Sequence, residues 1–146
     1  MSGSPDIARK LGIRPGQRIC LLDATPDSAA LPRATCADVE FDDALAQGHY
    51  DLVFLWPRTL DGFAARLMEL QRAIAPDGAI WVVIPKQAIA RKRGLDFTWE
   101  QMQAAALTTD LVDNKIAALT DEEYATRFVI RKERRGAYPD AMSGNG

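Results

Sequence analysis

The residues that follow the first apolar run of the sequence are candidates for binding a cofactor. The run Arg18–Asp23 is almost continuously apolar, as expected of a strand that is covered on both faces of a parallel sheet. Ligands of open α/β sheets bind in the crevice outside the carboxyl ends of such strands. The loop that follows this strand holds Asp23, Ala24, Thr25 and Asp27, and the family resemblance given below implies that these are the cofactor-binding candidates.

A further cofactor-binding candidate is Asp42, which follows a second predicted strand, Thr35–Phe41. In that strand apolar residues alternate with acids, a pattern typical of an edge strand with one wet face. An acid at the end of a second strand can accept hydrogen bonds from ribose hydroxyls. The alternative is a solvated charge, because other acids cluster there: Asp38, Glu40 and Asp43.

Two later predicted strands, Asp51–Trp56 and Ala79–Ile84, are each followed by a proline. Trp56, Pro57 and Lys86 lie at the ends of these strands and are therefore candidates for binding a small ligand. Lys86 could hold an anion there. Its alternative role is that of a solvated lysine after a strand-ending proline.

A basic stretch without acids comes next, and in it Arg91, Lys92 and Arg93 are candidates for contacting a partner. Residues 23–51 hold seven acids and a single base, Arg33, so the sequence predicts a surface with two oppositely charged regions. Such a surface favours a protein partner over a uniform polyanion. The alternatives are an ordinary solvated face and binding of nucleic acid by this stretch, which would depend steeply on salt.

Hydrolytic and metal-based chemistry finds little support in the spacing of the reactive residues. His49 is the only histidine, and the serines lie mostly near the ends of the chain, so no triad can be inferred. Cys20, Cys36 and His49 could supply three zinc ligands, but no C-x-x-C spacing is present and Cys20 lies inside a predicted strand. We therefore expect core cysteines and no metal site.

Periodicity and turn residues predict the elements that position these candidates. A short helix is predicted over 5–12 and one helical turn between Pro26 and Pro32. An amphipathic helix is predicted over 61–75, ended by a turn at 76–78, and a capping box at Thr98 and Gln101 predicts a further helix to Leu107. Two strands over 111–119 and 124–131, joined by four residues, predict an antiparallel pair.

Strands that alternate with helices, followed by a terminal hairpin, predict an α/β fold. The expected architecture is a Rossmann-like three-layer sandwich, with a mostly parallel sheet and a C-terminal antiparallel hairpin. Residues 1–135 are expected to form a single domain, and the Gly- and Ser-containing residues 136–146 a disordered tail.

Length and composition are those of one globular domain. The chain has 146 residues, of which 47% are hydrophobic and 26% charged, close to the globular average. Its net charge of −2 is too balanced for a dedicated nucleic-acid or membrane-surface binder. No apolar run approaches the ~18 residues of a membrane span, and the first ten residues lack the apolar region of a secretory signal. We therefore expect a cytoplasmic protein.

Three passages of the chain resemble one enzyme family. Gly16–Asp23 is similar to a first strand that reads "G-x-R-V-L-D-L", and Ala73–Ile80 is similar to an "L-x-P-G-G-x-L" passage before a fifth strand. The closing hairpin corresponds in place and order to the last two strands of the same family. These passages resemble class I S-adenosylmethionine-dependent methyltransferases, which implies their fold.

The chain also resembles a family of small bacterial proteins of unknown function that have a trimmed form of this fold. The shared passages are a "K-L-G-I-x-P-G-Q-R" opening at Lys10–Arg18, a strand ending in Pro85-Lys86, and "L-V-D-N-K" at Leu111–Lys115. This resemblance covers nearly the whole chain. It implies a methyltransferase-like sheet from which the third strand and its helix are lost, and it implies no activity.

The loop after the first strand departs from the methyltransferase pattern. In those enzymes a G-x-G-x-G loop lets backbone N–H groups approach the carboxylate end of the cofactor. Here no glycine occurs between Gly16 and Gly48, and Pro26 lacks an N–H group. The passage Leu55-Trp56-Pro57 also lacks the polar residue that amino-methyltransferases place before Pro-Pro.

We therefore expect a non-catalytic or vestigial methyltransferase-like domain without a cofactor, which acts as a binding or regulatory module for a protein or a small anionic ligand. The alternative is a small S-adenosylmethionine- or nucleotide-dependent enzyme with an unconventional glycine-free cofactor loop, in which Asp23 could face the amino group of the cofactor. The sequence leaves open whether the protein is an enzyme.

Overall fold

One sheet forms the centre of the computed structural model, which describes residues 5–34 and 38–137. Its strand order is β2-β1-β3-β4-β6-β5, with β2, β1, β3 and β4 parallel and β6 antiparallel to both of its neighbours. This confirms a mostly parallel sheet that ends in an antiparallel hairpin. The strands of the described residues are β1 (Arg18–Leu22), β2 (Glu40–Asp42), β3 (Tyr50–Leu55), β4 (Ile74–Pro85), β5 (Leu111–Ala118) and β6 (Glu123–Ile130).

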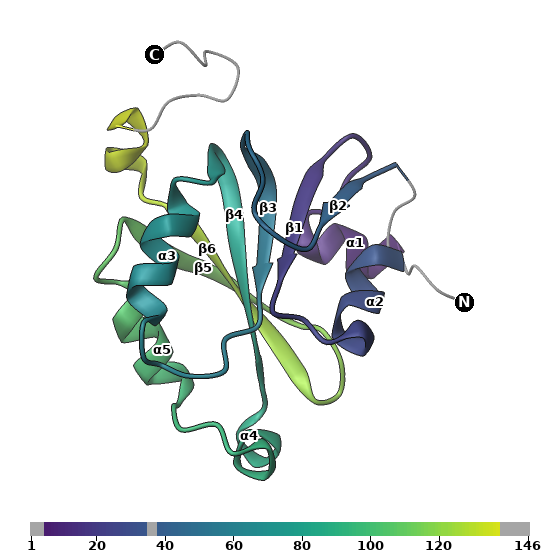
Figure 1. Ribbon diagram of the computed structural model, residues 1–146, viewed down its shortest axis with the longest axis vertical. Helices are drawn as coiled ribbons and strands as arrows, with labels where there is room; N and C mark the ends of the chain where they lie inside the picture. The colour runs from purple at the N-terminus through teal and green to yellow at the C-terminus, as the bar shows by residue number, and fades with distance from the viewer. Residues whose placement is uncertain (1–4, 35–37, 138–146) are drawn as a thin grey trace.

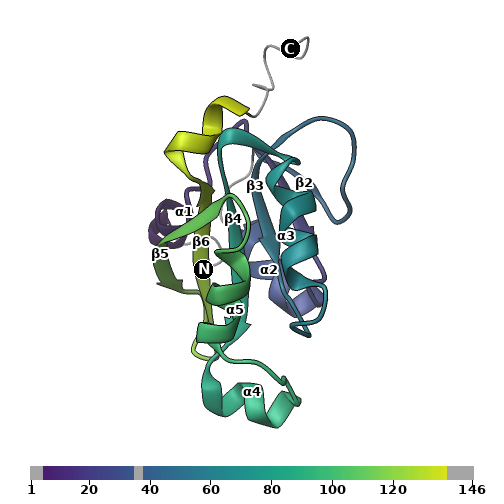
Figure 2. The ribbon, with the colours of Figure 1, turned by 90° about the vertical axis from the view of Figure 1, so that its left-hand side faces the viewer.

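Helices cover both faces of the sheet and make the three layers that the sequence predicts. Figure 1 shows α1 and α2 on one face and α3 and α5 on the other, and Figure 2 shows the same layers turned by 90°. A short helix, α4, projects beyond the end of the sheet in both views. The helices are α1 (Pro5–Leu11), α2 (Pro26–Ala34), α3 (Phe63–Gln71), α4 (Gln87–Arg93), α5 (Trp99–Ala106) and the 3₁₀ helix η1 (Lys132–Ala137).

The strand β4 is apolar throughout its second half because each of its faces packs against a different helical layer. Ile80 and Val82 belong to the core beneath α3 and α5, whereas Trp81 and Val83 belong to the core beneath α1 and α2. Both cores exclude water from the sheet, so the alternation of polar and apolar residues is absent. The indole N–H of Trp81 donates to the carbonyl of Leu11 over 2.9 Å and fixes the end of α1 on the sheet.

The boundary between α3 and β4 differs from the prediction. The helix ends at Gln71 instead of residue 75, and β4 begins at Ile74, so residues 76–78 lie inside a strand and are not a turn. The register against β3 shifts across this segment, which lets the chain bulge. A Cβ at Gly78 would lie 2.8 Å from the carbonyl oxygen of Asp51, so the close approach of the two backbones requires glycine.

Four other elements differ from the predictions in length or kind. Helix α2 spans nine residues instead of one turn, and α4 forms a helix in the basic stretch, where the sequence analysis predicts no helix. The strand β2 lies at the sheet edge, as predicted, but is only three residues long, and residues 35–37 of the predicted strand lie outside the described residues. Gly136 belongs to η1 rather than to a tail, and residues 138–146 also lie outside the described part of the chain.

Helix α5 begins as the sequence predicts. The Thr98 hydroxyl accepts from the N–H of Gln101 at 3.1 Å, and the Gln101 amide oxygen accepts from the N–H of Thr98 at 2.9 Å. This reciprocal pair satisfies two backbone donors that a helix start leaves open. Across the described residues, the structure has no helix long and apolar enough to cross a membrane.

Candidate functional site

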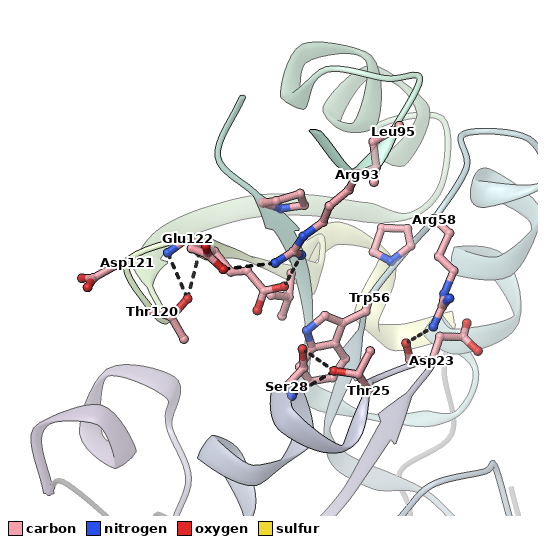
Figure 3. A pocket seen from close by; sticks show the side chains of 15 residues that line it. Asp23, Thr25, Ser28, Trp56, Arg58, Arg93, Leu95, Thr120, Asp121 and Glu122 are labelled. Atoms are coloured by element: carbon pink, nitrogen blue, oxygen red, sulfur yellow. Dashed lines mark hydrogen bonds and ion pairs between the residues drawn. The ribbon is translucent and has the colours of Figure 1, made fainter. Parts of the chain in front are cut away.

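A cavity of about 650 Å³ lies at the carboxyl ends of β1, β3 and β4, and we call it the switch-point cavity. Asp23 lines it at the end of β1, Trp56 at the end of β3 and Pro85 at the end of β4. The opposite walls are the β5–β6 turn at Thr120–Glu123 and the end of α4 at Arg93 (Figure 3). In the sheet, β1 lies between β2 and β3. The chain passes from β1 to β2 on one side and then crosses to β3 on the other side, so the direction of the strand order reverses at β1. Such reversal points are where open α/β sheets bind ligands.

The side chain of Trp56 forms the middle of the cavity wall. It is 7% exposed, and its ring lies 6.2 Å from that of Phe54, which anchors it on the sheet. Its indole N–H is buried and has no hydrogen-bond partner among the described residues, whereas those of Trp81 and Trp99 both donate at 2.9 Å. Buried donors are nearly always paired in folded proteins. Trp56 therefore has a buried donor, beside the cavity, that no described residue uses.

Asp23 adopts a left-handed backbone conformation, with φ at 65°, in the position that immediately follows β1. Glycine is the residue best suited to this region, and aspartate is one of the few others that tolerate it. The guanidinium of Arg58 donates to the Asp23 carbonyl over 3.4 Å and bridges the ends of β1 and β3. Asp23 and Arg58 also line a second, smaller cavity of about 340 Å³. The two residues therefore lie between this cavity and the switch-point cavity.

The beginning of α2 is closed by its own chain. The Thr25 hydroxyl accepts from the Ser28 N–H at 3.1 Å, and the Thr25 carbonyl accepts from the Ala29 N–H at 2.9 Å. Pro26 has no N–H group to offer. The first turn of α2 therefore has few free donors for a carboxylate or a phosphate group.

An ion-pair cluster closes the cavity on the side of α4. The guanidinium of Arg93 lies 3.0 Å from the carboxylate of Glu123 and 3.4 Å from that of Glu122. Glu123 is only 5% exposed, and the ion pair with Arg93 offsets the cost of burying its carboxylate. The N–H of Lys86 donates to the Glu122 carbonyl at 2.8 Å, which ties the start of α4 to the same turn.

The cavity lining carries more negative than positive charge. Four carboxylates stand against two guanidinium groups, which gives a formal charge of −2. The carboxylates of Glu122 and Glu123 are paired with Arg93, whereas those of Asp23 and Asp121 make no hydrogen bond or ion pair with the described residues. Figure 3 shows these two unpaired acids at opposite ends of the cavity, with Trp56 between them.

The structure brings some of the sequence-predicted site residues together and leaves others apart. The cavity lining contains five of them: Asp23, Thr25, Trp56, Pro57 and Arg93. Lys86, Arg91 and Lys92 are exposed and lie outside the lining, as does Ala24. Asp27 falls within α2, and its side chain lies outside the described part of the structure.

The carboxylate of Asp42 is held in a network within the sheet, apart from the cavity lining. It accepts from the Tyr50 hydroxyl at 2.6 Å and from the Arg18 guanidinium at 3.3 Å. Burial, together with the hydrogen bond to Asp42, raises the pKa of Tyr50 to about 12. Burial and the same carboxylate raise the pKa of the neighbouring Cys20 thiol to about 11. These contacts give Asp42 a structural role in joining β2 to β3.

Sequence reasoning missed the residues that the hairpin and β3 bring to the cavity. Pro85 pairs with Glu123, so the turn between β5 and β6 lies beside the carboxyl end of β4. The four-residue link between the two predicted strands was the signal that could have placed Thr120 and Asp121 here. Arg58 follows Pro57 at the end of β3 and could have been found by the same rule that singled out Trp56.

In the part of the chain that the structure describes, no group of three or more His, Cys, Asp or Glu side chains is arranged to hold a metal ion. Cys20 is fully buried in the core, and burial raises the pKa of its thiol to about 11, which makes it a poor ligand. Cys36 lies outside the described residues.

Comparison with protein-family models matches most of the chain. A family model described as "Protein of unknown function (DUF3052)" matches residues 8–132. No curated protein matches the chain.

Solved structures with a similar fold include methyltransferases. A TehB-like enzyme from Corynebacterium glutamicum is 13% identical with a TM-score of 0.56, over 90% of this chain and 89% of that one. Magnesium protoporphyrin IX methyltransferase from Synechocystis, solved with bound SAH, is 11% identical with a TM-score of 0.58, over 87% and 80%. The N-methyltransferase NodS from Bradyrhizobium japonicum is 11% identical with a TM-score of 0.52, over 87% and 93%. At these identities the similarity shows the fold alone.

Proposed function

The chain belongs to the DUF3052 family and has a methyltransferase-like fold, and we propose that it is a non-catalytic or vestigial domain that acts by binding a ligand in the switch-point cavity. The observation that carries this proposal is the buried indole N–H of Trp56. It lies without a partner at the place where open α/β sheets bind ligands. Leaving a buried donor unpaired costs stability, and a ligand with an acceptor would remove that cost.

The residues after β1 do not fit the carboxylate end of S-adenosylmethionine. The family resemblance implies that backbone N–H groups of a glycine loop hold this end. Here Pro26 has no such group, and Thr25 occupies the N–H groups of Ser28 and Ala29. The lining also carries a formal charge of −2, which repels a carboxylate. These features support a domain that has the methyltransferase fold without the cofactor.

The exposed end of α4 supports a role for a protein partner. Arg91 and Lys92 are exposed, and α4 has no buried residue, so this helix presents its charges away from the core. Acidic surfaces of another protein are the complement of such a patch. Arg93 is excluded from this proposed patch because its guanidinium is bound to Glu122 and Glu123.

Calorimetric titration with S-adenosylhomocysteine tests the proposal against its main alternative. We expect no heat of binding up to millimolar ligand with the wild-type protein. The variant Asp23→Asn keeps a residue that tolerates the left-handed conformation and removes the charge. Micromolar binding that is lost in this variant would overturn the non-catalytic proposal.

That alternative is a small S-adenosylmethionine- or nucleotide-dependent enzyme with a glycine-free loop. The observation in its favour is the place of the cavity, at the carboxyl ends of β1 and β3 in a methyltransferase-like fold. In such an enzyme the Asp23 carboxylate would meet the amino group of the cofactor. A positive titration would therefore direct the search to methyl acceptors.

A further inference from the structure

Building on the proposed function, we infer that the switch-point cavity binds a ligand with two features. The ligand carries a positively charged group, such as a guanidinium or an ammonium group, and beside it a hydrogen-bond acceptor, such as a carbonyl oxygen. This inference differs from the sequence analysis, which predicts a small anionic ligand or a protein partner. It rests on two independent features of the cavity, the charge of its lining and the unused donor of Trp56.

The charge of the lining favours a cation at either end. Asp23 and Asp121 keep their carboxylates free of ion pairs with the described residues, whereas Glu122 and Glu123 are already neutralised in part by Arg93. Arg58 is the remaining cation; its guanidinium donates to the Asp23 carbonyl and keeps its positive charge, so the lining as a whole carries a formal charge of −2. A negative ligand would meet more like than unlike charge here, and a positive one gains attraction from both free acids.

The unpaired indole N–H group of Trp56 favours a ligand that also carries a hydrogen-bond acceptor. Figure 3 shows its indole ring pointing into the space between Ser28 and the Thr120–Glu122 turn. The ring is more than nine-tenths buried, and its N–H group has no partner among the described residues. A carbonyl oxygen would pair with it, and the face of the same ring attracts a cation. One ligand that has both groups can therefore pair with the Trp56 donor and with the free carboxylates of the lining.

Two sources could supply this chemistry, a free amino acid or amine and a basic side chain in a peptide segment. Calorimetric titrations compare N-acetyl-arginine methylamide, free arginine and the neutral N-acetyl-citrulline methylamide, which has nearly the same shape. We expect the arginine amide to bind about tenfold or more tightly than the citrulline amide, because hydrogen bonds to charged groups contribute more. Tighter binding of the capped arginine than of free arginine indicates a peptide source, and the reverse order indicates a small molecule.

Matched variants locate the cation. Asp23→Asn and Asp121→Asn each remove one free carboxylate, and Asp96→Asn is the control because this exposed acid lies outside the lining. We expect at least one lining variant to weaken the arginine amide about fivefold or more, with the control unchanged. Trp56→Phe keeps an aromatic ring but removes the donor, and it should weaken all the amides alike while the thermal midpoint shows that the protein is folded.

The outcomes separate this inference from the proposed function. If the citrulline amide or N-acetyl-glutamate methylamide binds as tightly as the arginine amide, the inference about charge is wrong and the cavity remains a ligand site. If Trp56→Phe leaves the binding of every probe unchanged, the inference about the acceptor is wrong. If none of these probes binds at millimolar concentration, both the inference and the proposed ligand cavity are wrong.

Discussion

The backbone N–H of Trp56 donates to the carbonyl of Leu22 over 3.1 Å, so the end of β3 is joined to the end of β1 at the base of the switch-point cavity. This bond continues the parallel pairing by one residue and fixes where the indole ring leaves the sheet. The free donor of Trp56 is therefore held by the fold itself. Its position does not depend on a flexible loop.

Two tryptophans that stack on the same phenylalanine should respond differently to loss of their N–H group. Trp81 and Trp56 lie 6.3 and 6.2 Å from Phe54, but only the N–H of Trp81 is bonded, to the Leu11 carbonyl. We expect Trp81→Phe to lower the free energy of unfolding by about 1–3 kcal/mol more than Trp56→Phe, because it leaves a buried acceptor unpaired. Urea denaturation of both variants measures this, and equal losses would contradict the assignment of Trp56 as an unpaired donor.

A methyl group should not be tolerated at Gly78. Its Cβ would lie 2.8 Å from the Asp51 carbonyl oxygen and 3.2 Å from that of Tyr50, and both are backbone atoms that cannot move aside cheaply. We expect Gly78→Ala to cost about 1–3 kcal/mol in the free energy of unfolding. Gly136→Ala is the control, because a Cβ there meets nothing within 4 Å. A Gly78→Ala protein as stable as the control would contradict the close approach of the β3 carbonyls to Gly78.

The ion pair at the end of α4 should contribute to stability more than its exposed neighbours do. Arg93→Gln leaves the buried carboxylate of Glu123 without its 3.0 Å partner, so we expect a loss of about 1–3 kcal/mol. Arg91→Gln, on the same helix and exposed, should change stability by less than about 0.5 kcal/mol. Chemical denaturation distinguishes the two, and similar small effects would mean that Arg93 is a solvated residue like Arg91.

Alkaline pH should destabilise the protein through Tyr50 and Cys20. Their pKa values rise from 10.0 to about 12 and from 9.0 to about 11, so the folded state keeps protons that the unfolded state has lost. The free energy of unfolding therefore falls as pH rises, from about pH 9 for the thiol and pH 10 for the phenol. We expect Tyr50→Phe to have a shallower decline above pH 10 than wild type, measured by urea midpoints. A decline equally steep in the variant would contradict this role.

The central strands β1, β3 and β4 were predictable because they are apolar on both faces. Trp81 and its neighbours in β4 pack against two helical layers, and this burial appears in the sequence as a continuous apolar run. The capping box at Thr98 was readable for a different reason, since its two hydrogen bonds join residues three apart. Local chemistry and two-sided burial are both visible without tertiary information.

Features that depend on distant neighbours were not predictable in the same way. Helix α4 has no buried residue, so its sequence shows no apolar stripe from which a helix could be inferred. Arg93 looked like one of three equivalent bases, yet its partners Glu122 and Glu123 lie about thirty residues away in the chain. The bulge before Gly78 likewise depends on contacts with β3, which the Pro-Asp-Gly sequence alone does not reveal.

The most direct test of the account is a ¹H–¹⁵N spectrum of the indole N–H signals, recorded with S-adenosylhomocysteine and with N-acetyl-arginine methylamide. The chain has three tryptophans, and Trp56→Phe assigns the signal that belongs to the cavity. We predict that the arginine amide shifts the Trp56 signal and leaves those of Trp81 and Trp99 in place, because only Trp56 has a free donor. We predict no shift with S-adenosylhomocysteine. A Trp56 signal that moves with S-adenosylhomocysteine at micromolar concentration, and not with the arginine amide, would contradict the account.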